Sequence, residues 1–193
     1  MNASCNKQHF HTIVIGGGQA GLAIGYYLSR QERDFVILDE GLHIGMSWRK
    51  RWDRLQLFTP ARYSSLPGLP WPASAGTFLT KDEVADYLET YATRFHLPVR
   101  LDTAVGTLSR RDDRYRLSAG DQQLSADHVV VATGAFQHPR VPEFAIQLDP
   151  EIAQVHSSEY RNPTQLLDGD VLVVGAGNSG AEIALEVAQT SRT

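Results

Sequence analysis

The sequence predicts an α/β fold built around a parallel sheet. Two observations support this fold class. A short apolar, β-branched stretch runs directly into a glycine turn and then into a helical pattern, and the same succession returns near the other end of the 193-residue chain. Because the two turns begin far apart, at Gly16 and Gly175, they indicate one duplicated element rather than an array of short repeats.

The first copy predicts a strand, a helix and a second strand. Residues 12–15 are apolar or β-branched, which is typical of a buried strand. Apolar side chains then recur at helical spacing between Ala20 and Leu28, and residues 35–38 predict another buried strand. Together they form a βαβ unit, the connection that joins two parallel strands.

The segment that follows is expected to be a loop and then a helix. Residues 41–71 are rich in Gly, Pro, Trp and Arg, and a loop of this length in a compact domain is typical of a functional segment. Thr80 and Glu83 have the spacing of a capping box, so a helix starts there. Its aromatic side chains Tyr87 and Tyr91 lie at helical spacing and are expected in the core.

An antiparallel insertion is expected in the middle of the chain. Residues 99–108 and 115–117 predict strands joined by the charged turn 110–114. Residues 129–131 then predict a buried strand, and residues 139–163 a connector that contains several prolines.

The second copy lies at the end of the chain. Residues 171–174 predict a strand, and Ala181, Ala184, Leu185 and Ala188 predict the apolar face of the helix behind the glycine turn. The next strand of this unit would begin where the chain stops. An unpaired strand over residues 171–174 would therefore leave an edge for association, so a homo-oligomer is one expectation.

The first glycine turn has the pattern of a dinucleotide-binding motif. Gly16 permits the sharp turn from strand to helix, Gly18 lets a pyrophosphate approach the backbone, and Gly21 lets helix and strand pack closely. The helix N-terminus then holds the phosphates. Asp39, near the end of the second strand, is expected to accept hydrogen bonds from a ribose, with Glu40 as the alternative. A plain packing turn is the competing interpretation.

The second turn carries Gly175, Gly177 and Gly180 at the same spacing, but the chain ends before an acid or arginine could follow. The choice between NAD and NADP is therefore not written in this sequence, and a turn that binds nothing is the competing interpretation. Two such turns suggest two cofactors, a flavin dinucleotide and a nicotinamide dinucleotide. We expect a Rossmann-like first domain over residues 1–142, a connector over 143–169 and the first βα unit of a second Rossmann-like domain over 170–193.

Composition excludes several classes of protein. The 18 basic and 22 acidic residues give a net charge of −4, which argues against a nucleic-acid partner. A single cysteine, Cys5, permits neither an intrachain disulfide nor a redox pair, and the histidines lack metal-ligand spacing, so no metal is expected. Without a signal-peptide pattern or an apolar stretch of membrane-spanning length, we expect a cytoplasmic protein that does not enter membranes.

The combined motifs resemble the bacterial flavin-containing monooxygenase-like flavoproteins, FAD/NAD(P)-binding oxidoreductases related to the plant auxin-forming flavin monooxygenases. The resemblance extends from Phe10 to Gln189 and matches the N-terminal portion of that family. The residues that carry it are Gly16–Leu22, Gly45–Trp48, Arg51–Asp53, Leu57–Pro60, Ala132–Gly134 and Gly175–Gly180. Two departures are Met46, where the family often has glycine, and the absence of the signature Phe-x-Gly-x-x-x-His.

The resemblance implies roles for individual residues but identifies no catalytic side chain. The N-terminal turn would hold the FAD pyrophosphate, Asp39 and Glu40 the adenosine ribose, and the backbone of Val105 the adenine. The residues implied at the pyrophosphate are Gly16, Gly18, Gln19, Ala20 and Gly21, and those implied along the flavin are Ser47, Trp48 and Trp52. The cofactor cleft would be closed by Ala132, Thr133 and Gly134. The residues implied at the NADP site are Gly175, Gly177, Asn178, Ser179 and Gly180.

The resemblance also implies an activity. NADPH would reduce FAD, and O₂ would then form a flavin hydroperoxide that oxygenates a small organic substrate. Because family members are usually longer, the alternative is a truncated, non-catalytic nucleotide-binding protein. A disulfide reductase of similar architecture is disfavoured by the lone Cys5.

Overall fold

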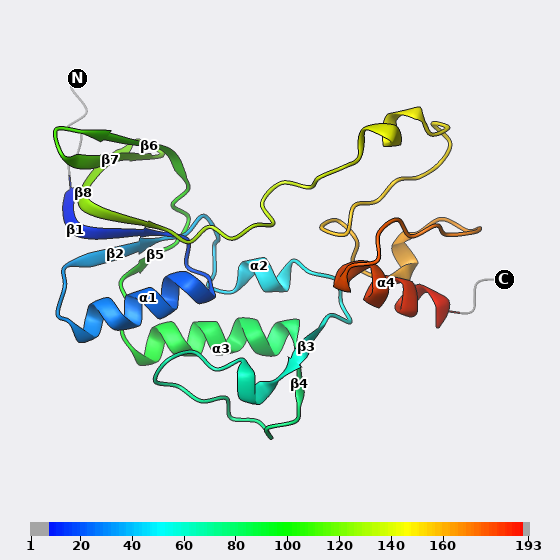
Figure 1. Cartoon of the computed structure of the whole chain (residues 1–193), viewed down its shortest axis with the longest axis horizontal. Helices are drawn as coiled ribbons and strands as arrows, with labels where there is room; N and C mark the ends of the chain where they lie inside the picture. The colour runs from blue at the N-terminus through cyan, green and yellow to red at the C-terminus, as the bar shows by residue number, and fades with distance from the viewer. Residues whose placement is uncertain (1–7, 191–193) are drawn as a thin grey trace.

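The computed structural model describes residues 8–190, and its ribbon places a sheet with two long helices at one end and a smaller lobe at the other (Figure 1). The main sheet has six strands in the order β5-β2-β1-β8-β7-β6. In chain order they are β1 (Gln8–Ile15), β2 (Phe35–Leu38), β5 (Val99–Arg100), β6 (Val105–Arg111), β7 (Arg114–Ala119) and β8 (Gln122–Val131). The predicted α/β class is confirmed.

The parallel part of this sheet is centred on β1. Strand β1 pairs in parallel with both β2 and β8, so that Ile13 lies between Val36 and Val129. Ile13 and Val14 point to opposite faces of the sheet, and both are fully buried. The continuous apolar run of this strand is therefore explained, because a central parallel strand is covered on both faces.

The antiparallel part is a meander of β6, β7 and β8. Its tight turn occupies Asp112 and Asp113, both with positive φ angles, and is thus shorter than the predicted turn over 110–114. Aspartate adopts this backbone at lower cost than most residues because its short polar side chain can form local hydrogen bonds. The inner residues Leu117 and Leu124 pack with Ile13 in a core cluster on one face of the sheet.

Two helices cover the other face. They are α1 (Gln19–Arg30) and α3 (Lys81–Arg94), and Leu22, Ile37 and Tyr91 are buried in the cluster where they meet the sheet (Figure 1). Helix α3 begins with the predicted capping box: Thr80 Oγ1 accepts from the Glu83 amide at 3.3 Å, and the Thr80 amide donates to Glu83 Oε2 at 2.8 Å.

The predicted loop over residues 41–71 contains regular structure that the sequence did not reveal. It holds the short helix α2 (Met46–Arg49), strand β3 (Gln56–Pro60) and a 3₁₀ turn (Ala61–Tyr63). Strand β3 pairs antiparallel with β4 (Phe78–Thr80). A strand this short has little periodicity of its own, and its hydrogen bonds come from a partner some twenty residues away.

The smaller lobe holds the connector and α4 (Asn178–Ala188), with 3₁₀ turns at Glu143–Gln147 and Pro163–Gln165 (Figure 1). The predicted strand over residues 171–174 is not formed. No neighbouring strand among the described residues supplies hydrogen bonds to it, and Leu172 and Val174 are 87% and 67% exposed. An apolar sequence favours a strand, but a strand exists only when a partner completes the ladder.

The predicted apolar face of α4 is also wrong for this structure. Ala181, Leu185 and Ala188 are exposed and Ala184 is half-buried, whereas Ile183 and Glu186 face the rest of the molecule. Helical spacing finds an apolar stripe correctly, but it does not determine which surface is available to cover it.

Within residues 8–190, no helix combines the length and apolar character needed to cross a bilayer, and no group of three or more acidic, histidine or cysteine side chains is arranged to hold a metal ion. Cys5 lies outside the described residues.

Candidate functional site

The first glycine turn lies where β1 ends and α1 begins, between two other strand ends. Gly16 has a φ angle of +106° and donates its amide to the Leu38 carbonyl oxygen at 2.7 Å. A Cβ at Gly16 would overlap the carbonyl of Ala132, and one at Gly21 would overlap the carbonyl of Gly16. The first and third glycines are therefore required by the backbone of this chain itself.

The second glycine faces open space. A Cβ at Gly18 would meet no atom within 4 Å, and the φ angle of Gly18 is an ordinary −80°. Gly18 is the N-cap of α1 and carries no side chain to cap the helix, so the amides of its first turn, Gln19 to Gly21, have no intrahelical acceptor. The free space therefore adjoins donors and the positive end of a helix dipole, a combination that binds phosphate groups.

Asp39 closes one side of this cradle. Its carboxylate accepts hydrogen bonds from the amides of Gly17 at 2.6 Å and Gly41 at 2.8 Å, so it also fixes the glycine turn. The sequence motif singled out Asp39 but missed Gly17 and Gly41 as its donors. The adjacent Glu40 is exposed and has no such contact among the described residues, which favours Asp39 over Glu40 as the acid of the site.

The other rim is formed by the end of β8. The Ala132 amide donates to the Ile15 carbonyl at 2.8 Å, and the Thr133 carbonyl accepts from Gln137 Nε2 at 3.0 Å. Gly134 follows with a φ angle of +75° and open space around it. The carboxyl ends of adjacent parallel strands thus meet at one edge, where α/β sheets generally bind ligands.

Val105 is connected to the same edge through the backbone. It begins β6, and two residues before it the Thr103 amide donates to the Asp39 carbonyl oxygen at 2.8 Å. The structure therefore brings together the glycine turn, Asp39, the 132–134 segment and the approach to Val105.

The three residues expected along a flavin lie in different surroundings. Ser47 is exposed on α2, and Trp48 beside it is half-buried between two core clusters. Trp52, by contrast, is only 4% exposed and packs with Leu55, Tyr160 and Ile183 in a third cluster. In the described structure Trp52 thus acts as a core residue between the two lobes, and its role toward a flavin stays a prediction.

The second glycine turn reproduces the backbone of the first. Gly175 has a φ angle of +110°, Gly177 is the N-cap of α4 with an extended backbone, and a Cβ at Gly180 would overlap the carbonyl of Gly175. Asn178 and Ser179 begin the helix, whose first amides again lack intrahelical acceptors. The turn therefore keeps its shape although residues 171–174 before it form no strand.

Two basic side chains that follow the Gly45–Trp48 segment, Arg49 and Arg51, already have interaction partners in the protein. Arg49 pairs with Asp86 at 2.6 Å, and the hydrogen bond to Asp86 raises the pKa of this guanidinium. The guanidinium carbon Cζ of Arg51 lies 5.0 Å from the ring centre of Phe136. Burial lowers the pKa of Arg51 from its ordinary value, and the nearby positive charge of Arg161 lowers it further. Arg51 is therefore a partly buried cation beside Phe136, in the segment that follows β8.

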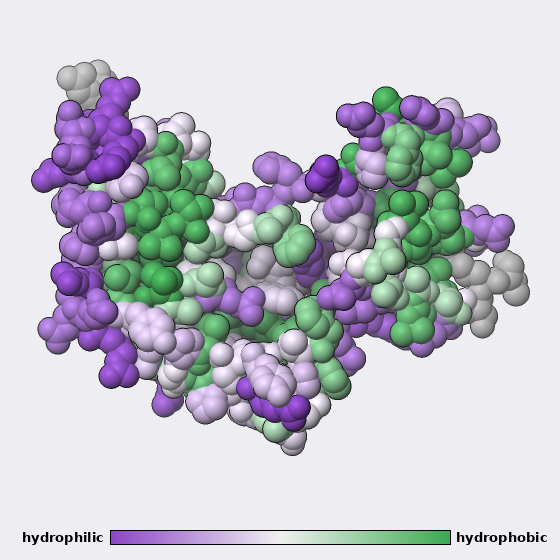
Figure 2. Space-filling view, in the orientation of Figure 1, coloured by the Kyte–Doolittle hydropathy of each residue, from purple (hydrophilic) through white to green (hydrophobic). Residues whose placement is uncertain are grey.

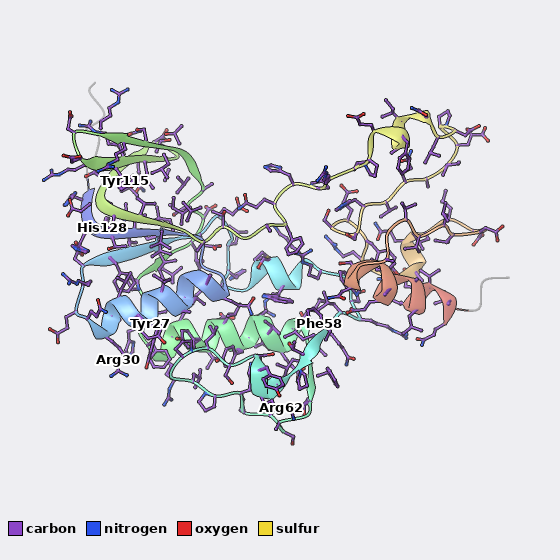
Figure 3. All side chains as sticks on the ribbon, in the orientation of Figure 1. Tyr27, Arg30, Phe58, Arg62, Tyr115 and His128 are labelled. Atoms are coloured by element: carbon purple, nitrogen blue, oxygen red, sulfur yellow. The ribbon has the colours of Figure 1, made fainter. Side chains whose placement is uncertain are left out.

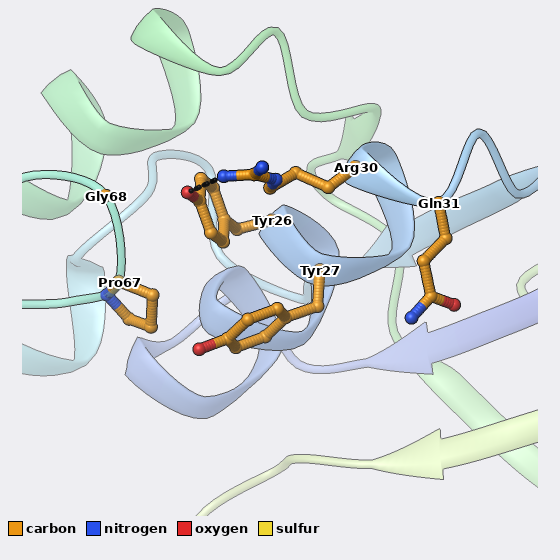
Figure 4. Close-up of a pocket in the computed structure, with 6 residues that line it drawn as sticks. All are labelled: Tyr26, Tyr27, Arg30, Gln31, Pro67 and Gly68. Carbon is orange, nitrogen blue, oxygen red and sulfur yellow. Dashed lines mark hydrogen bonds between the residues drawn. The ribbon is translucent and has the colours of Figure 1, made fainter.

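A separate open groove of about 580 Å³ lies at the opposite end of α1 (Figure 4). Tyr26 and Tyr27 line it, and Arg30 Nη1 donates to the Tyr26 hydroxyl at 3.1 Å. Figure 3 labels Tyr27 and Arg30 at this end of the helix. Because the glycine turn is at the helix N-terminus, this groove is not part of the dinucleotide site.

The arrangement of turn, acid and strand ends agrees with the comparisons with known proteins. A family model described as pyridine nucleotide-disulphide oxidoreductase matches residues 13–193. The chain belongs to this family. Among its relatives, a CzcO-like uncharacterized oxidoreductase of Geobacillus kaustophilus is 49% identical over 177 residues, which cover 92% of this chain and 51% of that protein.

Flavin monooxygenases are among the proteins to which this chain is similar. An indole-3-pyruvate monooxygenase of Oryza sativa is 36% identical, with 91% of this chain and 44% of that protein covered. The solved structure of a mutant flavin monooxygenase from Stenotrophomonas maltophilia superposes with a TM-score of 0.89 at 38% identity and covers 96% of this chain and 56% of that one. The predicted resemblance is confirmed, and the chain spans about half the length of these relatives.

Proposed function

We propose that this protein is an FAD-dependent oxidoreductase of the flavin monooxygenase type, with NADP(H) as its reductant and O₂ and a small organic molecule as substrates. The observation that carries the proposal is the open amide cradle at Gly18, with Asp39 at its side. The name of the 38% identical relative, a flavin monooxygenase, supports the choice of flavin.

The residues present fit a dinucleotide. The space at Gly18 would admit a pyrophosphate against the amides of Gln19 and Ala20, and any side chain at Gly18 would occupy that space. On binding, the Asp39 carboxylate would give up part of its hydrogen bonding to the amides of Gly17 and Gly41 and would accept hydrogen bonds from the hydroxyl groups of the ribose instead. When bound, FAD would supply the hydride-transfer and O₂ chemistry, and the protein would bind and orient it.

The other residues of the chain would bind and orient. Ser47 and Trp48 on α2 would lie along the flavin, and Ala132 to Gly134 would close the cleft at the end of β8. The turn from Gly175 to Gly180 would hold the pyrophosphate of NADP(H) in the same manner as the first turn. The preference for NADP over NAD, and a cytoplasmic location, stay predictions from the sequence.

This proposal does not include a redox disulfide, although the family name contains the word. Such a mechanism requires two cysteines that can pair, and the sequence contains Cys5 alone.

The test is FAD binding to the purified chain, with two matched glycine variants. Gly18 and Gly76 both have room for a Cβ and lack a positive φ angle, but Gly76 lies far from the turn in sequence, in the loop before β4. We expect Gly18→Ala to weaken FAD affinity at least about tenfold, or ~1.4 kcal/mol, because the methyl group displaces the pyrophosphate. Gly76→Ala should bind FAD like the unmodified chain.

Visible absorption of bound flavin and titration of its fluorescence measure the affinity. A chain that takes up no FAD, or a Gly18→Ala variant with unchanged affinity, would contradict the proposal. If FAD binds but NADPH is not oxidised and O₂ is not consumed, this chain is the non-catalytic nucleotide-binding protein of the alternative interpretation.

A further inference from the structure

The two glycine turns are positioned by different means. Gly16 is fixed by the sheet, since it contacts the carbonyls of Leu38 and Ala132 on neighbouring strands. A Cβ at Gly175 would meet nothing within 4 Å, and residues 171–174 pair with no strand of the described chain. The position of the second turn must therefore be set from its other side, through α4.

Helix α4 contacts the sheet lobe through a small buried cluster. Ile183 packs with Trp52, Leu55 and Tyr160, and each of the four is at most 9% exposed. Trp52 and Leu55 follow α2, whose Trp48 packs against both this cluster and the main core. The cluster thus links the second turn to the lobe that contains the first.

A polar contact lies within this apolar cluster. Glu186 is 5% exposed, Tyr160 is 3% exposed, and the Tyr160 hydroxyl donates to Glu186 Oε2 at 3.0 Å. The nearest cation is the exposed Arg54, whose Nε lies 3.9 Å from Glu186 Oε1. A buried carboxylate is costly unless it is hydrogen-bonded, and a directional bond to it defines one orientation of the helix.

The connector next to Tyr160 is tied to the same loop. The Asp53 amide donates to the Arg161 carbonyl at 2.8 Å, and Asn162 Nδ2 donates to the Asp53 carboxylate at 2.7 Å. One turn before Glu186 on α4, burial raises the pKa of Glu182, and a backbone hydrogen bond from Gln56 partly offsets this. Connector, loop and helix therefore meet at one point.

The groove beside this contact is open. It has a volume of about 350 Å³ and lies between β3 and α4, with Phe58 and Leu185 on its sides; Figure 3 shows Phe58 near the start of α4. An apolar contact that is open on one side lets α4 slide against the loop, because the hydrophobic effect is not directional. The Tyr160–Glu186 hydrogen bond supplies the direction that the apolar contacts lack.

We infer that Tyr160 and Glu186 are positioning residues whose hydrogen bond holds the second glycine turn at a fixed place relative to the first. The inference rests on the proposed function, in which the first turn holds FAD and the second NADP(H). Neither residue lies in a turn, so the bond sets where the reductant stands without contributing to its affinity.

The test uses the full FAD-loaded chain and four variants. Tyr160→Phe removes the donor, Glu186→Leu removes the acceptor, and Glu186→Gln keeps an acceptor oxygen. Tyr63→Phe is the matched control, since Tyr63 is 70% exposed and lies in the 3₁₀ turn after β3. FAD affinity should stay within about twofold in all four, because none of the three residues lies in the first glycine turn or contacts Asp39, and the substitution at Tyr160 keeps its ring against Trp52.

Hydrogen exchange of the Asp53 amide, which donates to the carbonyl of Arg161 next to Tyr160, reports whether the connector keeps its place against the loop. It should be about tenfold faster in Tyr160→Phe and Glu186→Leu, and unchanged in Glu186→Gln and Tyr63→Phe. Anaerobic reduction of the flavin by increasing NADPH reports the function. The limiting rate should fall about tenfold in the first two variants while the NADPH dissociation constant stays within about threefold.

Unchanged exchange at Asp53 in Tyr160→Phe would overturn the inference. A raised NADPH dissociation constant with an unchanged limiting rate of flavin reduction in Tyr160→Phe would also overturn it. That result is expected if the hydrogen bond only stabilises the fold of the second turn. If the unmodified chain is not reduced by NADPH at all, the proposed function fails, and the exchange at Asp53 still decides whether the Tyr160–Glu186 bond holds the junction of connector, loop and α4 together.

Discussion

Two glycines with similar backbone angles have different surroundings, and their substitution separates strain from steric overlap. Gly45, at the start of α2, has a φ angle of +78°, and a Cβ there would lie 2.7 Å from the Ala85 Cα atom of α3. Gly134 has a φ angle of +75° and open space. The same methyl group is therefore expected to cost more at Gly45.

We expect Gly134→Ala to lower the free energy of unfolding by about 1–2 kcal/mol, the cost of a left-handed backbone. Gly45→Ala should lower it by roughly 1–3 kcal/mol more, because α2 must move away from α3. Urea denaturation followed by circular dichroism measures both. Equal losses in the two variants would show that α2 moves freely on α3.

A buried pair of tyrosines makes stability depend on alkaline pH. Burial raises the pKa of Tyr91 well above its ordinary value, and it also raises that of Tyr87. The Tyr91 hydroxyl donates to the Pro67 carbonyl at 2.7 Å, so the folded state keeps this proton when the unfolded chain loses it. The stabilisation is complete below the ordinary pKa and is lost as the pH rises through the raised one.

Above roughly pH 10, the free energy of unfolding should therefore fall by about 1.4 kcal/mol for each pH unit and for each of these buried tyrosines. Urea midpoints measured at neutral and alkaline pH test this. Tyr91→Phe should have a shallower pH dependence, and Tyr63→Phe, at an exposed position, should have the same dependence as the unmodified chain. A slope that Tyr91→Phe leaves unchanged would contradict the assignment.

At the scale of elements, two stretches of similar apolar sequence have opposite outcomes. Residues 12–15 pair on both sides in β1, whereas residues 171–174 pair with no described strand. Amide hydrogen exchange should therefore be slow at Ile13 and Val14 and close to the unprotected rate at Leu172 and Val174. Protection at Leu172 that grows with protein concentration would indicate that a second copy of the chain pairs with this segment.

The whole molecule presents apolar side chains on its smaller lobe (Figure 2). Ile146, Leu172 and Leu185 are 89%, 87% and 61% exposed. Exposed patches of this kind and an unpaired segment both favour association, so we expect this chain to self-associate as its concentration rises.

Sedimentation velocity over a concentration series measures this association. Leu172→Lys combined with Leu185→Lys should shift the chain toward monomer, because two charges would have to be buried between copies. Leu42→Lys is the control, since Leu42 is also 62% exposed but lies in the loop after β2. A monomer at all concentrations, or an equal effect of Leu42→Lys, would contradict the expectation.

The sequence by itself determined most of the local elements and the backbone shape of the first glycine turn. Short-range patterns sufficed for β2, for the capping box at Thr80 and for the glycine turn with Asp39, because each depends on residues that are close in the sequence. The antiparallel insertion was also predicted, since its strands are joined by a tight turn. The predicted strand over residues 99–108 is in fact two strands, because residues 99–100 pair in parallel with β2 as β5 and only β6 belongs to the insertion.

The tertiary structure alone decided which surfaces are covered. It left residues 171–174 without a strand, exposed the predicted apolar face of α4, and buried Trp52, Tyr160 and Glu186 between the lobes. A strand ladder or a buried face requires a second surface, and for Trp52 that surface comes from Tyr160 and Ile183, more than a hundred positions away in the sequence. Periodicity records what one segment offers, whereas burial depends on what the rest of the chain brings to meet it.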